Sequence, residues 1–426
     1  MASPRLAKFQ EIRLWKAIYE YWREAALAYA GCIELYAGGA KGADALKAGM
    51  PLLLARALRA LAAQVKWMYV RYGPMDASVW GAIAKIYALA ETRKFAQTPV
   101  TLYPGIPGES TPEQEFLKAV MLAASSPDSL LPLEIELCER LIAHFCASFT
   151  LRLDLQPDIA YWIDLAAGQA PQRLARAPQP APTLRFFAAG KALGELQSLI
   201  NTIKAAGTVP AQVNLGGSYP AETVLDVLEH LALYWSTRPP ERKHQRQRVK
   251  SRLNVVHGFD GVLGVFGTGP GEGAAMETWI VEDVSAGGFG AGIPEIRGEW
   301  LKIGCLLGLQ PEGGDTWVLG VIRRLQRESS LKGSVGIQTI ARSAELLQLR
   351  VKGGGTETGV LISDGSEAPG DVRMLLHAGG FVPGRNLEHP RGQATCLLLP
   401  QGLVDSGDDY ELVRFREMIR EAASEE

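Results

Sequence analysis

The first half of the chain carries apolar residues at helical spacing. Over residues 10–30, Leu14, Ile18 and Trp22 recur every four positions, and further apolar residues extend the same face toward residue 29. Such spacing predicts an amphipathic helix with one buried stripe. By the same criterion we expect helices over 51–72, 77–96, 112–124, 131–147, 191–206 and 221–235. The last of these should end before Pro239 and Pro240, which cannot continue a helix.

Beyond residue 245 the pattern changes to short runs rich in Val, Ile and Leu that alternate with glycine. About six such runs up to residue 342, from RLNVVHGF through GVLGVFG and TWIVEDVS to GSVGIQTI, predict a small antiparallel barrel or sandwich. Similar runs between 345 and 417 predict a second β unit, and a short charged helix is expected at 411–424. The proline-rich stretch 170–184 is interpreted as a loop or linker.

These patterns predict an α+β multidomain protein. We expect a helical domain at 1–168, a linker with helices leading to the barrel at 169–237, a β-barrel at 238–342 and a C-terminal β-rich unit at 343–426. A length of 426 residues agrees with several domains, because one hydrophobic core rarely serves so long a chain.

Composition narrows the class of protein. The net charge of −2 argues against the whole molecule binding polyanions. The five cysteines form no C-x-x-C pair, which favours reduced thiols and a cytoplasmic protein. Charges throughout the first 16 residues argue against a signal peptide. The most apolar run, beginning at Met50, is interrupted by Arg56 and Arg59, so no membrane insertion is expected.

One strand–turn junction suggests a binding site. The apolar, β-branched run TWIV leads into EDVSAGG, which places Asp283 and Ser285 two residues apart and therefore on one face of a strand. Gly287 and Gly288 follow directly. A turn would explain the glycines, but a carboxylate acceptor and a hydroxyl donor beside a backbone without side chains also suit the close approach of a ligand.

The most basic segment lies about 35 residues before that junction. Residues 238–252 hold seven Lys or Arg and one acid. A solvated linker is the simplest interpretation of such a charge run. Arginine, however, binds the O6/N7 edge of guanine and clamps phosphate, and an Asp accepts from the N1 and N2 donors of guanine. Together the two segments are suited to guanine plus phosphate.

The order of these motifs resembles the PilZ domain, a family of six-stranded antiparallel β-barrels that bind the bacterial second messenger cyclic di-GMP. Arg242 and Arg246 fit its R-x-x-x-R element, and Asp283, Ser285 and Gly288 fit its [D/N]-x-S-x-x-G element. The resemblance covers about residues 238–342. It implies a mobile arginine segment ahead of the first strand that wraps onto the nucleotide, with the second element surrounding a guanine on the barrel surface.

A second arginine pair, Arg248 and Arg252, also fits R-x-x-x-R and lies closer to Asp283, as is usual in the family. VKSRLNVV alternates like a strand, however, which would place Arg252 inside the first strand. We therefore favour Arg242 and Arg246, with Arg248 as an additional contact. This pair lies farther from Asp283 than is usual in the family, and we expect the glycine-rich stretch 267–273 to accommodate the additional residues.

Other candidates are weaker. Cys138, His144 and Cys146 lack metal-ligand spacing and are expected in the core, and HPRG at 389–392 is interpreted as a turn. No catalytic site and no cofactor are predicted. The leading hypothesis is a cyclic di-GMP receptor, not an enzyme, in which binding rearranges the helical region toward an unidentified protein partner. The alternatives are a ligand-free adaptor acting through protein contacts and, less well supported because stacking aromatics are absent, nucleic-acid binding through 238–252.

Overall fold

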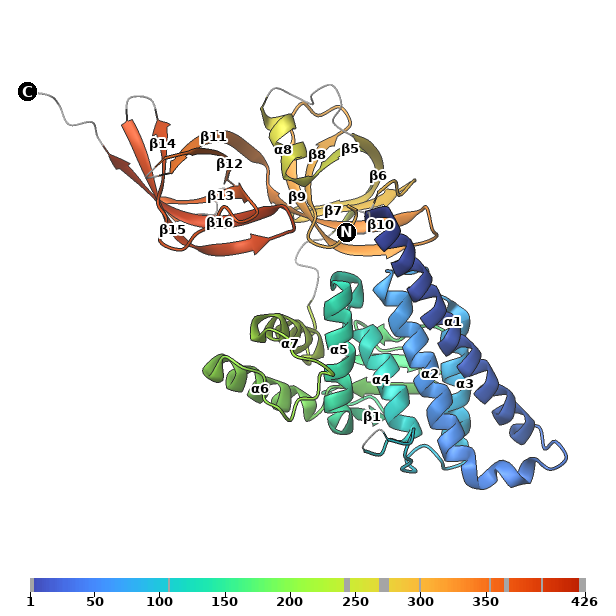
Figure 1. The fold of residues 1–426 in the computed structure, drawn as a ribbon. Coiled ribbons are helices and arrows are strands. Elements are labelled where there is room, and N and C mark those ends of the chain that lie inside the picture. Colours follow the sequence, from blue (N-terminus) through green and yellow to red (C-terminus); the bar gives the residue numbers. More distant parts are fainter. Residues whose placement is uncertain are drawn as a thin grey trace, which may run out of the picture. The chain divides into compact units, whose positions relative to one another are not determined.

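The computed structural model divides the chain into two compact units, residues 1–241 and 242–426 (Figure 1). The first is mainly helical, and the second consists of two closed six-stranded antiparallel barrels. The expected α+β architecture, with a helical N-terminal region followed by β-barrels, is confirmed. The structure describes residues 4–105, 108–240, 246–267, 276–298, 300–351, 354–363, 368–391 and 394–420.

The helical unit is built around α2, which contacts α1, α3, α4 and α5. Local signals explain where the helices begin and end. Thr111 and Gln114 form a reciprocal capping box at the start of α4, and Gly207 ends α6 in the left-handed conformation. The helices are α1 (Pro4–Ala37), α2 (Met50–Val70), α3 (Ala77–Thr92), α4 (Pro112–Ala124), α5 (Pro132–Phe145), α6 (Ala192–Ala206) and α7 (Ala221–Trp235).

All seven predicted helices of this unit are present, but a small sheet was not anticipated. Four short strands pair in the order β1-β4-β2-β3, and they flank and partly occupy the proline-rich stretch that was interpreted as a linker. They are β1 (Thr150–Arg152), β2 (Tyr161–Asp164), β3 (Gln172–Arg173) and β4 (Leu184–Ala188). Cys138 and Cys146 are buried, as expected, whereas His144 is exposed. Among the described residues, no helix combines the length and apolar character needed to cross a membrane.

The first barrel closes in the order β10-β7-β6-β5-β8-β9. The run GVLGVFG, read from the sequence as a strand, instead forms most of helix α8 (Gly258–Phe266), which buries Phe259, Val262 and Val265 on one face. The strands are β5 (Gln247–His257), β6 (Glu277–Ser285), β7 (Gly288–Ile293), β8 (Leu306–Pro311), β9 (Val318–Arg327) and β10 (Gly333–Ala341).

The second barrel closes in the order β11-β12-β13-β16-β15-β14. The expected helix at 411–424 is wrong over the described residues, because this segment continues as a strand to Arg420 between β13 and β15. The turn expected at 389–392 is also wrong for His389, which lies within β14. The strands are β11 (Ser343–Val351), β12 (Thr356–Ser363), β13 (Asp371–His377), β14 (Leu387–Arg391), β15 (Ala394–Ser406) and β16 (Tyr410–Arg420).

The two barrels share a hydrophobic core. One buried cluster joins Phe259 of α8 and Leu319 of the first barrel to Val360 and Tyr410 of the second. A polar contact reinforces it, since the carboxylate of Asp409, in the β15–β16 turn, accepts a 2.7 Å hydrogen bond from the Phe259 backbone N–H at the start of α8. The second barrel therefore caps a helix that follows a strand of the first.

Removing that cap should loosen the junction between the barrels. We expect Asp409→Ala to destabilise the second unit by about 1 kcal/mol, the usual loss for an N-cap side chain. Hydrogen exchange measured by mass spectrometry should show faster exchange in α8. Asp408→Ala is the matched control, because Asp408 is 71% exposed and forms a surface ion pair with Lys302. Equal protection of α8 in both variants would contradict the capping role.

Candidate functional site

The candidate site lies on the β6–β7 hairpin of the first barrel. Ser285 pairs with Gly288 across a two-residue turn, and the Ser285 hydroxyl donates a 3.4 Å hydrogen bond to the Gly288 carbonyl. Gly287 lies in this turn, where its carbonyl accepts a 3.0 Å bond from the Thr339 N–H beyond it in β10. The hairpin tip is thus held against β10 by backbone contacts.

Gly288 is required by this packing. Its φ angle is 154°, and a Cβ atom there would lie 1.9 Å from the carbonyl oxygen of Ile337 in β10. No side chain fits at that distance. Gly290 serves a second purpose, because a Cβ at this position would lie 2.7 Å from a carboxylate oxygen of Asp283. The glycines therefore let the hairpin pack on β10 and let the Asp283 carboxylate lie over the β7 backbone.

Asp283 is paired with one of the predicted arginines. Nη1 of Arg246 lies 2.8 Å from Oδ2 of Asp283, and the two side chains are 32% and 25% exposed. The other oxygen, Oδ1, is buried, and no hydrogen-bond donor among the described residues reaches it. A buried acceptor without a donor is energetically costly. One carboxylate oxygen therefore accepts from Arg246, and the other can accept a hydrogen bond from a further donor.

The remaining predicted arginines differ in position. Arg248 lies on β5, directly opposite Asp283 in the β5–β6 register, and its side chain is exposed. Arg252 lies farther along β5, opposite Ile280, and its backbone pairs with Glu312. It is within the first strand, as its alternating surroundings predicted. Arg242 and residues 268–273 of the glycine-rich stretch lie outside the described residues.

The structure adds Arg342 to this group. Its guanidinium donates a 3.3 Å hydrogen bond to the carbonyl of Ala286 in the hairpin turn. No local sequence signal singled it out, because it lies 56 residues from the turn and one residue beyond β10. Gly290 was also missed, although the alternating glycines of GFGAG were a visible sign of a strand with one bare face.

Comparison with known proteins concerns a different part of the chain. Residues 2–157 match a family model described as the N-terminal domain of the cyclic-di-GMP receptor FimW. These residues are therefore similar to the N-terminal domain of that receptor. The match spans less than half of the chain and covers α1 to α5 with the start of the small sheet. No curated protein and no solved structure matches the chain.

The two lines of evidence agree although they rest on separate residues. The family match to the FimW domain lies entirely within the helical unit, whereas the PilZ-like motifs lie in the first barrel. The expectation of a relationship to cyclic di-GMP receptors is confirmed by the match. The match also covers residues 2–157, a region for which sequence motifs indicated no role.

Proposed function

We propose that this protein is a cyclic di-GMP receptor that holds the nucleotide on the first barrel with Arg246 and Asp283. The observation that carries the proposal is the 2.8 Å contact between these two side chains beside the glycine hairpin. It joins the two halves of the PilZ-like signature, which are 37 residues apart in the sequence. The similarity of residues 2–157 to the N-terminal domain of a cyclic di-GMP receptor supports the same ligand independently.

The chemistry of the pair favours guanine. The buried Oδ1 of Asp283 can accept from the N1–H or N2–H of a guanine, which would satisfy its missing hydrogen bond. Adenine has no hydrogen at N1, so its ring nitrogen would face the carboxylate lone pairs. Arg246 can then contact a phosphate or the guanine O6/N7 edge. The further contacts proposed are Arg242, Arg248, Arg252, Ser285, Gly287 and Gly288, with Arg248 closer to Asp283 than Arg252 is.

Binding would be coupled to the helical unit through the basic segment that joins the two units. The two phosphates would neutralise arginines of 238–248 that otherwise repel one another, and the two guanines would accept hydrogen bonds from them. Converting a 1:99 equilibrium between two arrangements of the protein into 99:1 requires the ligand to bind one arrangement more tightly by roughly 5.5 kcal/mol. A handful of arginine–guanine contacts at about 1–3 kcal/mol each suffices for this difference. The rearranged helical unit would then act on a protein partner. Helix α1 offers apolar surface for one, since Leu14, Tyr21 and Leu35, spaced by multiples of seven residues, are each more than half exposed.

Titration calorimetry of the full chain with cyclic di-GMP tests the proposal. We expect saturable binding at micromolar concentration or tighter, and no comparable binding of cyclic di-AMP. The salt dependence should be shallow, whereas a nucleic-acid interface of seven basic residues would weaken steeply with salt. Small-angle X-ray scattering of the same samples tests the coupling through a change in radius of gyration. No heat and no thermal shift at ~100 μM ligand would exclude the receptor and leave the protein-binding adaptor.

A further inference from the structure

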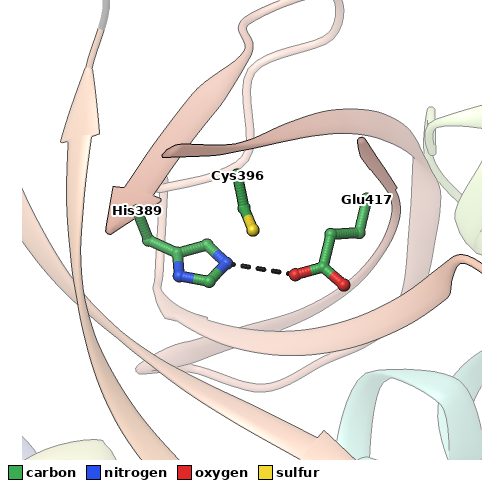
Figure 2. Close-up of side chains that lie close together, drawn as sticks. All are labelled: His389, Cys396 and Glu417. Carbon is green, nitrogen blue, oxygen red and sulfur yellow. Dashed lines mark hydrogen bonds and ion pairs between the residues drawn. The ribbon is translucent and has the colours of Figure 1, made fainter. Parts of the chain in front are cut away.

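Three potential metal ligands converge at one end of the second barrel. His389 of β14 lies directly opposite Cys396 of β15. Glu417 of β16 lies opposite Leu398, the next residue of β15 that shares the face of Cys396. Three adjacent strands thus direct an imidazole, a thiol and a carboxylate toward the same interior space, as Figure 2 shows.

The ligand atoms are close and shielded from solvent. Nε2 of His389 lies 3.3 Å from Oε1 of Glu417, and one atom from each of the three residues lies within 4.8 Å of both others. His389 is 5% exposed and Cys396 is completely buried, while the Glu417 side chain is 16% exposed. Cys396 is a thiol and not part of a disulfide.

This polar group interrupts an otherwise apolar interior. The neighbouring inward positions on the same three strands are Leu387, Leu398 and Phe415, all buried in the hydrophobic core of the barrel. If apolar residues also occupied the positions of His389, Cys396 and Glu417, no polar side-chain atom would be buried there. The hydrogen bond between His389 and Glu417 stabilises two of the groups, but it does not require a thiol at the third corner.

The composition and spacing suit zinc. Nitrogen, sulfur and carboxylate oxygen are the three ligand types of protein zinc sites, with bonds of about 2.0–2.3 Å in tetrahedral geometry. Two ligands at ~2.1 Å and a tetrahedral angle are about 3.4 Å apart, close to the 3.3 Å between His389 and Glu417. A thiolate disfavours Mg²⁺ and Ca²⁺, which take oxygen ligands.

We propose that His389, Cys396 and Glu417 bind a Zn²⁺ ion inside the second barrel. The thiol would lose its proton on binding, and the ion would link β14, β15 and β16 where the barrel ends. Three protein ligands leave a fourth tetrahedral position for water or another donor. This proposal is independent of nucleotide binding at the first barrel.

Metal titration of the chelator-treated, full-length protein tests the site. We expect one Zn²⁺ per chain, a thermal shift on zinc addition and, with Co²⁺ as the probe, the sulfur-to-cobalt charge-transfer band of a thiolate ligand. Cys396→Ser and Glu417→Gln, both close in shape to the native residue, should each weaken zinc binding about 100-fold or more. Cys32→Ser and His377→Ala, which lie on α1 and at the end of β13, should bind zinc like the native chain.

A second measurement needs no variant. Because Cys396 is completely buried, it can be alkylated only when the barrel opens, and zinc should slow that alkylation in mild denaturant, as resolved by peptide mass spectrometry, while Cys32 reacts at an unchanged rate. Absence of the cobalt–thiolate band, or equal zinc affinity in the native chain and both ligand variants, would overturn the proposal. The cluster would then be a buried His–Glu hydrogen bond beside a cysteine that packs as a small apolar residue.

Discussion

Replacing Arg246 by alanine should weaken cyclic di-GMP binding about 100-fold, equivalent to ~2.7 kcal/mol. The change removes a cation that contacts the ligand and also leaves the partly buried Asp283 carboxylate without its 2.8 Å partner. Truncating one member of such a pair at a binding surface costs about 2–5 kcal/mol. Titration calorimetry against native protein measures the loss directly.

Arg297→Ala is the matched control for this substitution. Arg297 is an arginine of the same barrel that also forms a carboxylate pair, with Glu295, but its side chain is 66% exposed and the pair lies outside the hairpin. Its removal should leave the affinity unchanged within about threefold. Equal losses in the two variants would mean that arginines act through general charge alone, and the assigned site would be wrong.

Asp283→Ala tests the recognition of guanine. The change removes the carboxylate that would accept from a guanine N–H, so discrimination between cyclic di-GMP and cyclic di-AMP should fall together with affinity. Unchanged discrimination would place the guanine elsewhere. A double-variant cycle with Arg246→Ala should be non-additive because the side chains are in contact.

Gly288→Ala should destabilise the first barrel by about 2–4 kcal/mol and thereby abolish nucleotide binding. The added Cβ would approach the Ile337 carbonyl oxygen to 1.9 Å, so β7 must move away from β10 or the hairpin must open. Because the chain has two units, a single melting temperature would not isolate the effect. Hydrogen exchange of peptides from β7 and β10 measures the opening of this barrel alone.

Gly264→Ala is the control for a glycine substitution in the same unit. Gly264 lies within α8, and a Cβ there meets nothing within 4 Å. Alanine has the higher helix propensity, so this variant should be as stable as the native chain or gain up to ~1 kcal/mol. If Gly288→Ala protected β7 and β10 as well as Gly264→Ala does, the close packing of the hairpin on β10 would be contradicted.

Part of the candidate site could be predicted because its motifs are local. Asp283, Ser285 and Gly288 lie within six residues, and their alternation and glycine content already indicate a strand entering a tight turn. Which arginine contacts Asp283 could not be predicted from spacing, because more than one R-x-x-x-R pair precedes it in the sequence. The β5–β6 register and the start of β5 place Arg246 within hydrogen-bonding distance, and they also bring Arg342 to the turn.

Local sequence patterns sufficed to predict the seven helices of the first unit and most of the barrel strands, since helical periodicity, capping residues and strand alternation act over a few residues. They did not determine α8, whose short apolar run suits a strand or a helix until Phe259 and Val262 are packed between the barrels. Nor did they determine residues 411–420, which are rich in charged residues typical of a helix and become β16 by pairing with β13 and β15. The grouping of His389, Cys396 and Glu417 likewise depends on barrel closure, because only pairing between strands joins residues that are distant in the sequence.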